Sequence, residues 1–164
     1  MAVLLAAQQP DLVSRLLLVG LPVLPLQHGR GVALPPVRAV ITTENRAAAH
    51  RANLAAIMIH QASRIDNDTV ALQVLNVARD RMRSRKLVTT DACSIAVRAL
   101  PCRFECIWGG EDVLCRGRWA EAHAACEASP HCARIALVPD AGHWVQYEQP
   151  EAFNQLLAVW ARRV

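Results

Sequence analysis

The C-terminal part of this chain alternates between short apolar runs and amphipathic stretches, and this alternation restricts the possible folds most strongly. Residues 104–108 and 133–138 have the length and apolar character of buried strands. Residues 119–128 and 150–162 have the spacing of helices, with a proline in the first turn of the second. This order indicates βαβ units and a parallel sheet, so we expect an α/β fold. The ligand site of such a sheet lies beyond the carboxyl ends of its strands.

The start of the chain shows the same pattern. Residues 1–9 have the spacing of the end of an amphipathic helix, which Pro10 stops. Residues 15–20 form a short apolar run bounded by turn residues, as expected for a third strand buried on both faces. A series of prolines then leads the chain out of the sheet.

The middle of the chain has helical spacing throughout. We expect a helix over residues 43–61, a second one capped by Asp66 or Asn67, and a shorter third one capped by Thr90 or Asp91. This is an all-helical insertion between two strands. The chain therefore divides into three parts, which are residues 1–26, 27–99 and 100–164.

Two loops that follow the last two predicted strands carry chemically active side chains. The first loop contains Asp112 and the second contains His143. If the strands are parallel, both side chains emerge at the same edge of the sheet. A carboxylate beside an imidazole fixes its tautomer and stabilises the imidazolium that forms during proton transfer. Glu111 or Asp140 could provide the carboxylate instead.

The sequences of these loops resemble the C-terminal end of an α/β-hydrolase. That family places its catalytic acid in a W-G-x-x-D loop, matched by Trp108, Gly109 and Asp112, and this spacing favours Asp112 as the acid. It places its histidine in a G-H loop, matched by Gly142 and His143. The G-H-W-x-x-x-E-x-P-x-x-F-N run over residues 142–154 is most similar to hydrolases that cleave carbon–carbon bonds in the products of meta-cleavage, as well as to esterases.

The resemblance implies the fold of nearly the whole chain. Residues 1–20 look like the helix after the family's nucleophile elbow followed by its sixth strand, and residues 27–99 look like its helical lid. We therefore expect the C-terminal part of an α/β-hydrolase fold, with about three parallel strands, flanking helices and an inserted lid.

No nucleophile is recognisable in the sequence. A nucleophile elbow needs glycines two residues before and after the nucleophile, and none of the serines or cysteines has them. The family order is nucleophile, acid, histidine, so we expect the serine and the oxyanion-hole amides upstream of Met1. The His28-Gly29 pair resembles an oxyanion loop, but no elbow follows it before Asp112, and we interpret His28 as an ordinary loop residue.

Four further residues are candidates for contact with a substrate. Trp144 follows the histidine directly and could line the pocket or pack in the core. Ring-fission hydrolases have acidic substrates and use a lid arginine; the resemblance in the lid does not single out one arginine here, and Asn53, Asn76 and Arg79 are the candidates. The basic run from Arg79 to Lys86 is best interpreted as the solvated end of a helix.

The composition argues against several other classes of protein. A net charge of +4 and an aromatic content of 4% disfavour a nucleic-acid binder. No stretch is long enough to span a membrane, and residues 1–7 lack the basic start of a signal peptide, so we expect a cytoplasmic protein. The cysteine spacings fit no common zinc pattern, so we expect the six cysteines to act as small apolar side chains and expect no metal or cofactor.

Two functional hypotheses follow. In the first, the chain is part of a serine hydrolase that cleaves small-molecule esters or ring-fission carbon–carbon bonds with a Ser-His-Asp mechanism. In the second, it is a non-catalytic, hydrolase-like protein that binds a partner through the sheet edge left bare by the absent fifth strand. In either case we expect these 164 residues to be inactive by themselves and poorly stable. The sequence does not indicate an oligomeric state.

Overall fold

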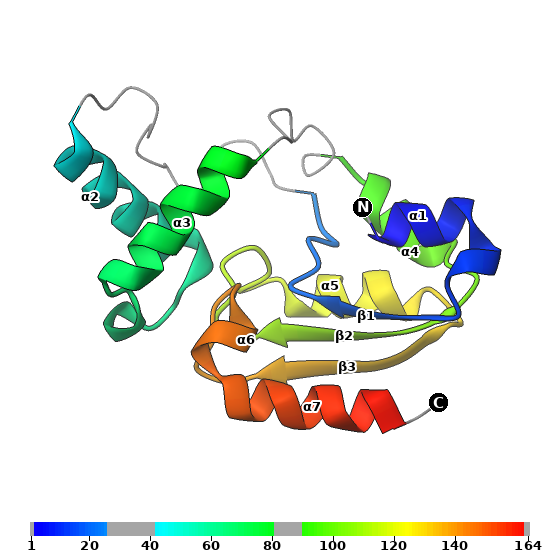
Figure 1. Ribbon diagram of the computed structural model, residues 1–164. Coiled ribbons are helices and arrows are strands. Elements are labelled where there is room, and N and C mark those ends of the chain that lie inside the picture. Colours follow the sequence, from blue (N-terminus) through cyan, green and yellow to red (C-terminus); the bar gives the residue numbers. More distant parts are fainter. Residues whose placement is uncertain (1, 26–41, 81–89, 163–164) are drawn as a thin grey trace.

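The sheet of the chain has three parallel strands in the order β1-β2-β3 (Figure 1). The computed structural model describes residues 2–25, 42–80 and 90–162. The strands are β1 (Arg15–Val19), β2 (Arg103–Gly109) and β3 (Cys132–Val138). In the register, Leu16 is opposite Phe104, which in turn is opposite Cys132. The predicted α/β class and the three parallel strands are confirmed.

Three helices cover one face of the sheet and form the main core with it. They are α1 (Ala2–Gln8), α4 (Ala92–Arg98) and α5 (Trp119–Glu127). Alternate residues of β2 point into this layer, because side chains alternate between the faces of a strand. Phe104, Cys106 and Trp108 are all fully buried there, among small side chains from the helices.

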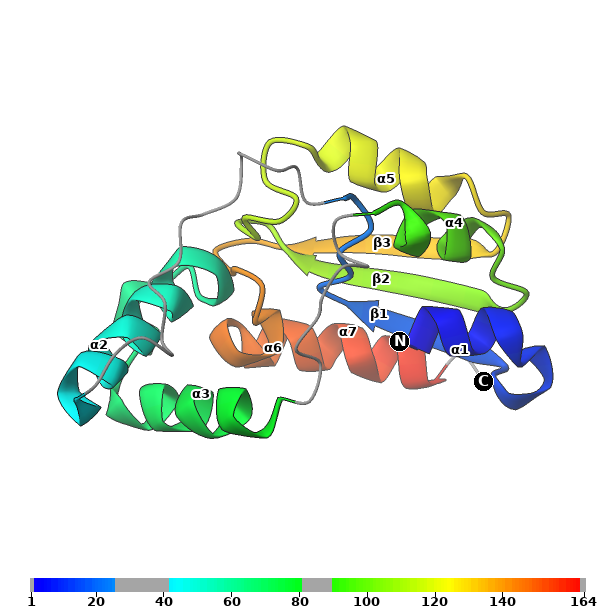
Figure 2. The same ribbon diagram turned by 90° about the horizontal axis from the view of Figure 1, so that it is seen from above.

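The opposite face is covered by the C-terminal segment. The long helix α7 (Pro150–Arg162) runs along the sheet, preceded by the short helix α6 (Val145–Glu148) (Figure 2). Ile107 and Val138 from the strands pack here against Phe153 and Leu156. Since both faces of β2 are buried, its apolar run needs no alternation with polar residues.

Apart from the 3-10 turn η1 (Pro10–Leu12), which lies between α1 and β1, the remaining helices of the described residues form a separate small body, called the lid below, beside the carboxyl ends of the strands. They are α2 (Thr43–Asn53), the π-helical turn η3 (Leu54–Met58), the 3-10 turn η4 (Ala62–Arg64) and α3 (Asn67–Arg79). Thr42 caps α2 and Asp66 caps α3, each accepting a hydrogen bond from a backbone N–H three residues later. Leu54, Ile59, Ile65 and Val70 give this lid a core of its own.

The lid differs from the expectation in two respects. The helix expected over residues 43–61 ends earlier, because the widened turn η3 closes with Ile59 in extended conformation and buried. In addition, α4 packs against α1 and α5 on the sheet and not with α2 and α3, because Ala96 and Val97 present small apolar side chains to the main core. The short helix α6 was not anticipated.

Two sequence features fall outside the described residues, namely His28 and residues 81–86 of the basic run. In the described parts of the chain, no helix combines the length and the apolar character that crossing a membrane requires.

Candidate active site

The loops after β2 and β3 are in direct backbone contact at the carboxyl edge of the sheet. The N–H of Gly110 donates to the carbonyl of Val138 at 2.7 Å, and the N–H of Glu111 donates to the carbonyl of Ala141 at 2.9 Å. A Cβ at Gly109 would overlap the carbonyl oxygens of Ala141 and Gly142. A glycine at this position therefore allows the loops to approach closely enough for their side chains to meet.

Asp112 is the carboxylate that the structure brings to His143. Its side chain is 1% exposed, and Oδ2 lies 2.8 Å from His143 Nδ1. The other oxygen, Oδ1, accepts the N–H of Leu114 at 3.0 Å, which fixes the orientation of the carboxylate. Of the two alternative acids, Glu111 pairs with Arg116 at the surface, and Asp140 is exposed in the turn before the histidine loop.

His143 is held between the acid and the end of β1. A Cβ at Gly20 would lie only 3.0 Å from His143 Cε1, so the imidazole packs directly on the backbone after β1. The side chain of His143 is 22% exposed. When Nδ1 carries a proton and donates it to Asp112, Nε2 is the basic nitrogen, as general acid–base chemistry requires.

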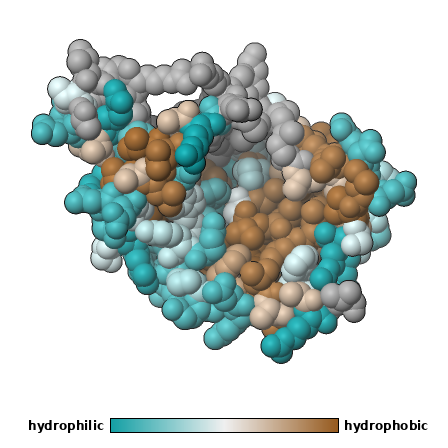
Figure 3. Space-filling view, viewed as in Figure 1, coloured by the Kyte–Doolittle hydropathy of each residue, from teal (hydrophilic) through white to brown (hydrophobic). Residues whose placement is uncertain are grey.

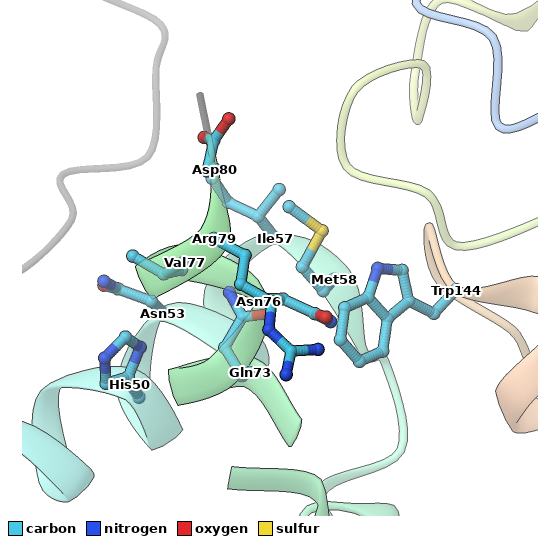
Figure 4. A pocket seen from close by; sticks show the side chains of 10 residues that line it. All are labelled: His50, Asn53, Ile57, Met58, Gln73, Asn76, Val77, Arg79, Asp80 and Trp144. Atoms are coloured by element: carbon cyan, nitrogen blue, oxygen red, sulfur yellow. The ribbon is translucent and has the colours of Figure 1, made fainter. Parts of the chain in front are cut away.

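An open pocket of about 480 Å³ lies between the lid and Trp144, the residue that follows His143; neither Asp112 nor His143 lines it (Figure 4). Trp144 forms its wall on the side of the sheet, and all three candidate lid residues, Asn53, Asn76 and Arg79, line it as well. Apolar contacts come from Ile57, Met58 and Val77, whereas the remaining lining is polar. The pocket therefore combines an apolar surface with a few polar groups, as small-molecule sites do.

His50 also lines the pocket, although nothing in the sequence had distinguished it from other histidines. It is 2% exposed, and its Nδ1 is buried without a hydrogen-bond partner among the described residues. Burial lowers the pKa of His50, and the nearby Arg46 lowers it further. His50 is therefore neutral at pH 7, and its ring can hydrogen-bond to a bound molecule.

The cysteines do not provide an alternative nucleophile. All six are free, and four are buried. Burial raises the pKa of Cys115 to about 12 and that of Cys132 to about 11, and a thiol is nucleophilic only as a thiolate. Within the described residues, no group of three or more histidine, cysteine or acidic side chains is placed to hold a metal ion.

The arrangement of strands, lid and loops is that of part of an α/β-hydrolase fold. A meta-cleavage product hydrolase from Pseudomonas fluorescens IP01 superimposes on 98% of this chain with a TM-score of 0.65 at 17% identity. A serine hydrolase from the hydrocarbon-degrading bacterium Cycloclasticus zankles matches 98% of the chain with a TM-score of 0.66 at 16% identity. A thermophilic esterase from Thermogutta terrifontis matches 99% with a TM-score of 0.63 at 17% identity.

The chain spans about 60% of the length of these structures, with values of 60%, 59% and 60% in the same order. No protein-family model and no curated protein matches it. The structural likeness shows the fold, and the expected resemblance to part of an α/β-hydrolase is confirmed at that level.

Replacing Gly109 with alanine tests the close contact between the two loops. We expect Gly109→Ala to lower the free energy of unfolding by roughly 3 kcal/mol, because the methyl group overlaps backbone carbonyls that cannot rotate away. Gly110→Ala is the matched control. Its Cβ meets no atom closer than 3.4 Å, so it should cost less than about 1 kcal/mol in the same urea titration. Equal losses in the two variants would contradict this account of the site.

The lowered pKa of His50 makes a prediction about pH. The unfolded chain binds a proton at His50 near the ordinary value of 6.5, whereas the folded chain binds it only at lower pH. The contribution of His50 to folding stability is therefore fully present above pH 6.5 and is lost as the pH drops through the folded-state pKa. Unfolding free energies measured from pH 7.5 to 5 should fall less steeply in His50→Gln than in the wild type. Parallel curves would show that His50 is not protected from protonation.

Proposed function

We propose that this chain provides the acid and the histidine of a serine hydrolase that acts on small molecules. The observation that carries the proposal is the 2.8 Å contact between Asp112 and His143 at the carboxyl edge of a parallel sheet, where the next residue, Trp144, lines a pocket. A serine from the part of the fold outside these residues attacks a carbonyl carbon. His143 Nε2 takes the serine proton and returns it to the leaving group, while Asp112 stabilises the imidazolium.

The pocket is lined by the cation of Arg79, which suits substrates with a negatively charged group, and also by the carboxylate of Asp80. In Figure 4 the guanidinium of Arg79 lies among Gln73, Asn76 and Trp144, where it can contact a bound molecule. A guanidinium binds a carboxylate through two parallel hydrogen bonds. The apolar side of the pocket suits a hydrophobic or aromatic body. These features favour acidic ring-fission products, which are cleaved at a carbon–carbon bond, over neutral esters as substrates.

One surface feature favours a second candidate function, in which the chain binds a protein partner without catalysing a reaction. β1 pairs with β2 on one side only, so its outer edge presents unpaired backbone groups within the described residues. Figure 3 shows apolar surface gathered over β1 and α1, where Leu5, Leu12 and Val19 are exposed. The partner would add a strand to β1. In a complete hydrolase fold, another strand of the same protein would pair with this edge of β1, so the exposed edge is compatible with both functions.

Joining the chain to its upstream coding sequence tests the proposed function. We expect the sequence before the Met1 codon to encode a strand followed by Gly-x-Ser-x-Gly, and the extended protein to hydrolyse ester or ring-fission substrates. His143→Ala and Asp112→Asn should each reduce kcat by on the order of 10³- to 10⁴-fold, because the general base is lost or misaligned. The 164-residue chain should show no turnover. Full activity of His143→Ala, or an upstream stop codon, would favour the non-catalytic alternative.

Arg79 tests the charge of the substrate. In the active extended protein, Arg79→Gln should raise KM for a substrate with a carboxylate by about tenfold or more, because a charge-assisted hydrogen bond is lost. KM for a neutral ester should change little. Arg98→Gln, which removes an exposed arginine from α4, is the matched control and should leave both values unchanged. A uniform rise in KM for both substrates after Arg79→Gln would contradict a specific role for its charge.

A further inference from the structure

Glu148 is a buried carboxylate that joins two distant parts of the chain. It is 0% exposed, and each of its oxygens accepts a backbone N–H. Oε2 accepts the N–H of Gly142 at 2.6 Å, and Oε1 accepts that of Gln61 at 2.7 Å. Gly142 directly precedes His143. Gln61 belongs to the lid and lies 87 residues before Glu148 in the sequence. One carboxylate therefore connects the histidine loop to the lid.

Further hydrogen bonds join the same two segments. The N–H of Trp144 donates to the carbonyl of Met58 at 2.9 Å, and the side-chain amide of Gln61 donates to the carbonyl of Asp140 at 2.7 Å. The hydroxyl of Tyr147 on α6 lies 2.6 Å from the hydroxyl of Thr69 on α3, which adds a contact between these two helices. The loop that carries His143 is thus attached to the lid before and after the histidine.

The same contacts adjoin the pocket. Met58 and Trp144 both line it, and they are bonded to each other through their backbones. A molecule that displaces either side chain acts directly on the segments that Glu148 holds. The lid and the catalytic histidine are therefore parts of one hydrogen-bonded unit, although different layers of the fold provide them.

We propose that Glu148 is a positioning residue that couples the lid to His143. Its carboxylate holds residues 58–61 and the histidine loop together, so that His143 keeps its alignment with Asp112 only when the lid is seated. The catalytic consequence rests on the proposed function, but the coupling itself does not require turnover. Glutamate suits this role because an ionised carboxylate is a pure acceptor and can receive both N–H groups.

The substitution Glu148→Gln tests this coupling with almost no change in shape. A glutamine offers one acceptor oxygen, so its NH₂ group would face one of the two backbone donors. In hydrogen-exchange NMR of the 164-residue chain, we expect the Gly142 and Gln61 amides to exchange roughly tenfold faster or more. The downfield signal of the His143 Nδ1 proton should weaken or disappear. Glu151→Gln, an exposed glutamate in the first turn of α7, is the matched control and should change neither.

A pair of lid variants keeps the test decisive if Glu148→Gln does not fold. Gln61→Ala keeps the backbone N–H that Glu148 accepts, whereas Gln61→Pro removes it, and the φ of −82° at this residue suits proline. Coupling predicts that Gln61→Pro, compared with Gln61→Ala, weakens the His143 Nδ1 signal and speeds exchange at Gly142. An unchanged His143 signal in Gln61→Pro, or in a folded Glu148→Gln, would overturn the proposal.

The extended enzyme separates this proposal from the proposed function. There, Glu148→Gln should lower kcat by roughly 100-fold with little change in KM, because misplacement of the base slows the chemical step and not binding. If His143→Ala abolishes activity but Glu148→Gln leaves kcat intact, the hydrolase function stands and the coupling fails. If His143→Ala retains activity while the NMR effects occur, the coupling stands without the function.

Discussion

The close contact between the loops after β2 and β3 is the constraint on which the rest of the site depends. Parallel strands place both loops at one edge, but they bring Asp112 within 2.8 Å of His143 only because Gly109 has no side chain to separate them. Trp108, one residue earlier, donates from Nε1 to the carbonyl of Leu21 and ties the same loop to the segment after β1. The packing of the core, the approach of the two loops and the acid–histidine contact therefore all depend on the end of β2, at Trp108 and Gly109.

The parts of this structure that depend on local pattern could be predicted from the sequence. Each strand is largely apolar, α7 begins at Pro150 as expected, and Asp66 caps α3. Parallel topology then sufficed to bring Asp112 and His143 to one edge. What could not be predicted depends on tertiary contacts. The placement of α4 follows from its packing between α1 and α5. The helix expected over residues 43–61 ends early because residues 58–61 bond to the histidine loop.

The pocket and its polar lining show the same limit. His50 is a single residue whose importance comes from burial, and no local pattern distinguishes it from exposed histidines, whereas Glu148 is the glutamate of the G-H-W-x-x-x-E run that begins at Gly142. The run alone did not show that Glu148, the last residue of the four-residue helix α6, is buried and bonded to the lid. By contrast, Asn53, Asn76 and Arg79 were candidates through the resemblance to ring-fission hydrolases, and all three line the pocket.

The insertion of the lid between two neighbouring strands has a consequence for how such chains can diverge. Because β1 and β2 are parallel neighbours, the chain leaves the sheet at the carboxyl end of β1 and returns at the amino end of β2, and the entropic cost of closing such a connection grows only with the logarithm of its length. The sheet therefore tolerates lids of very different size and shape. A new lid that supplies no backbone N–H for Glu148, however, would leave a buried acceptor oxygen unpaired. Selection can thus vary what the lid binds while it preserves the few hydrogen bonds that join residues 58–61 to the histidine loop.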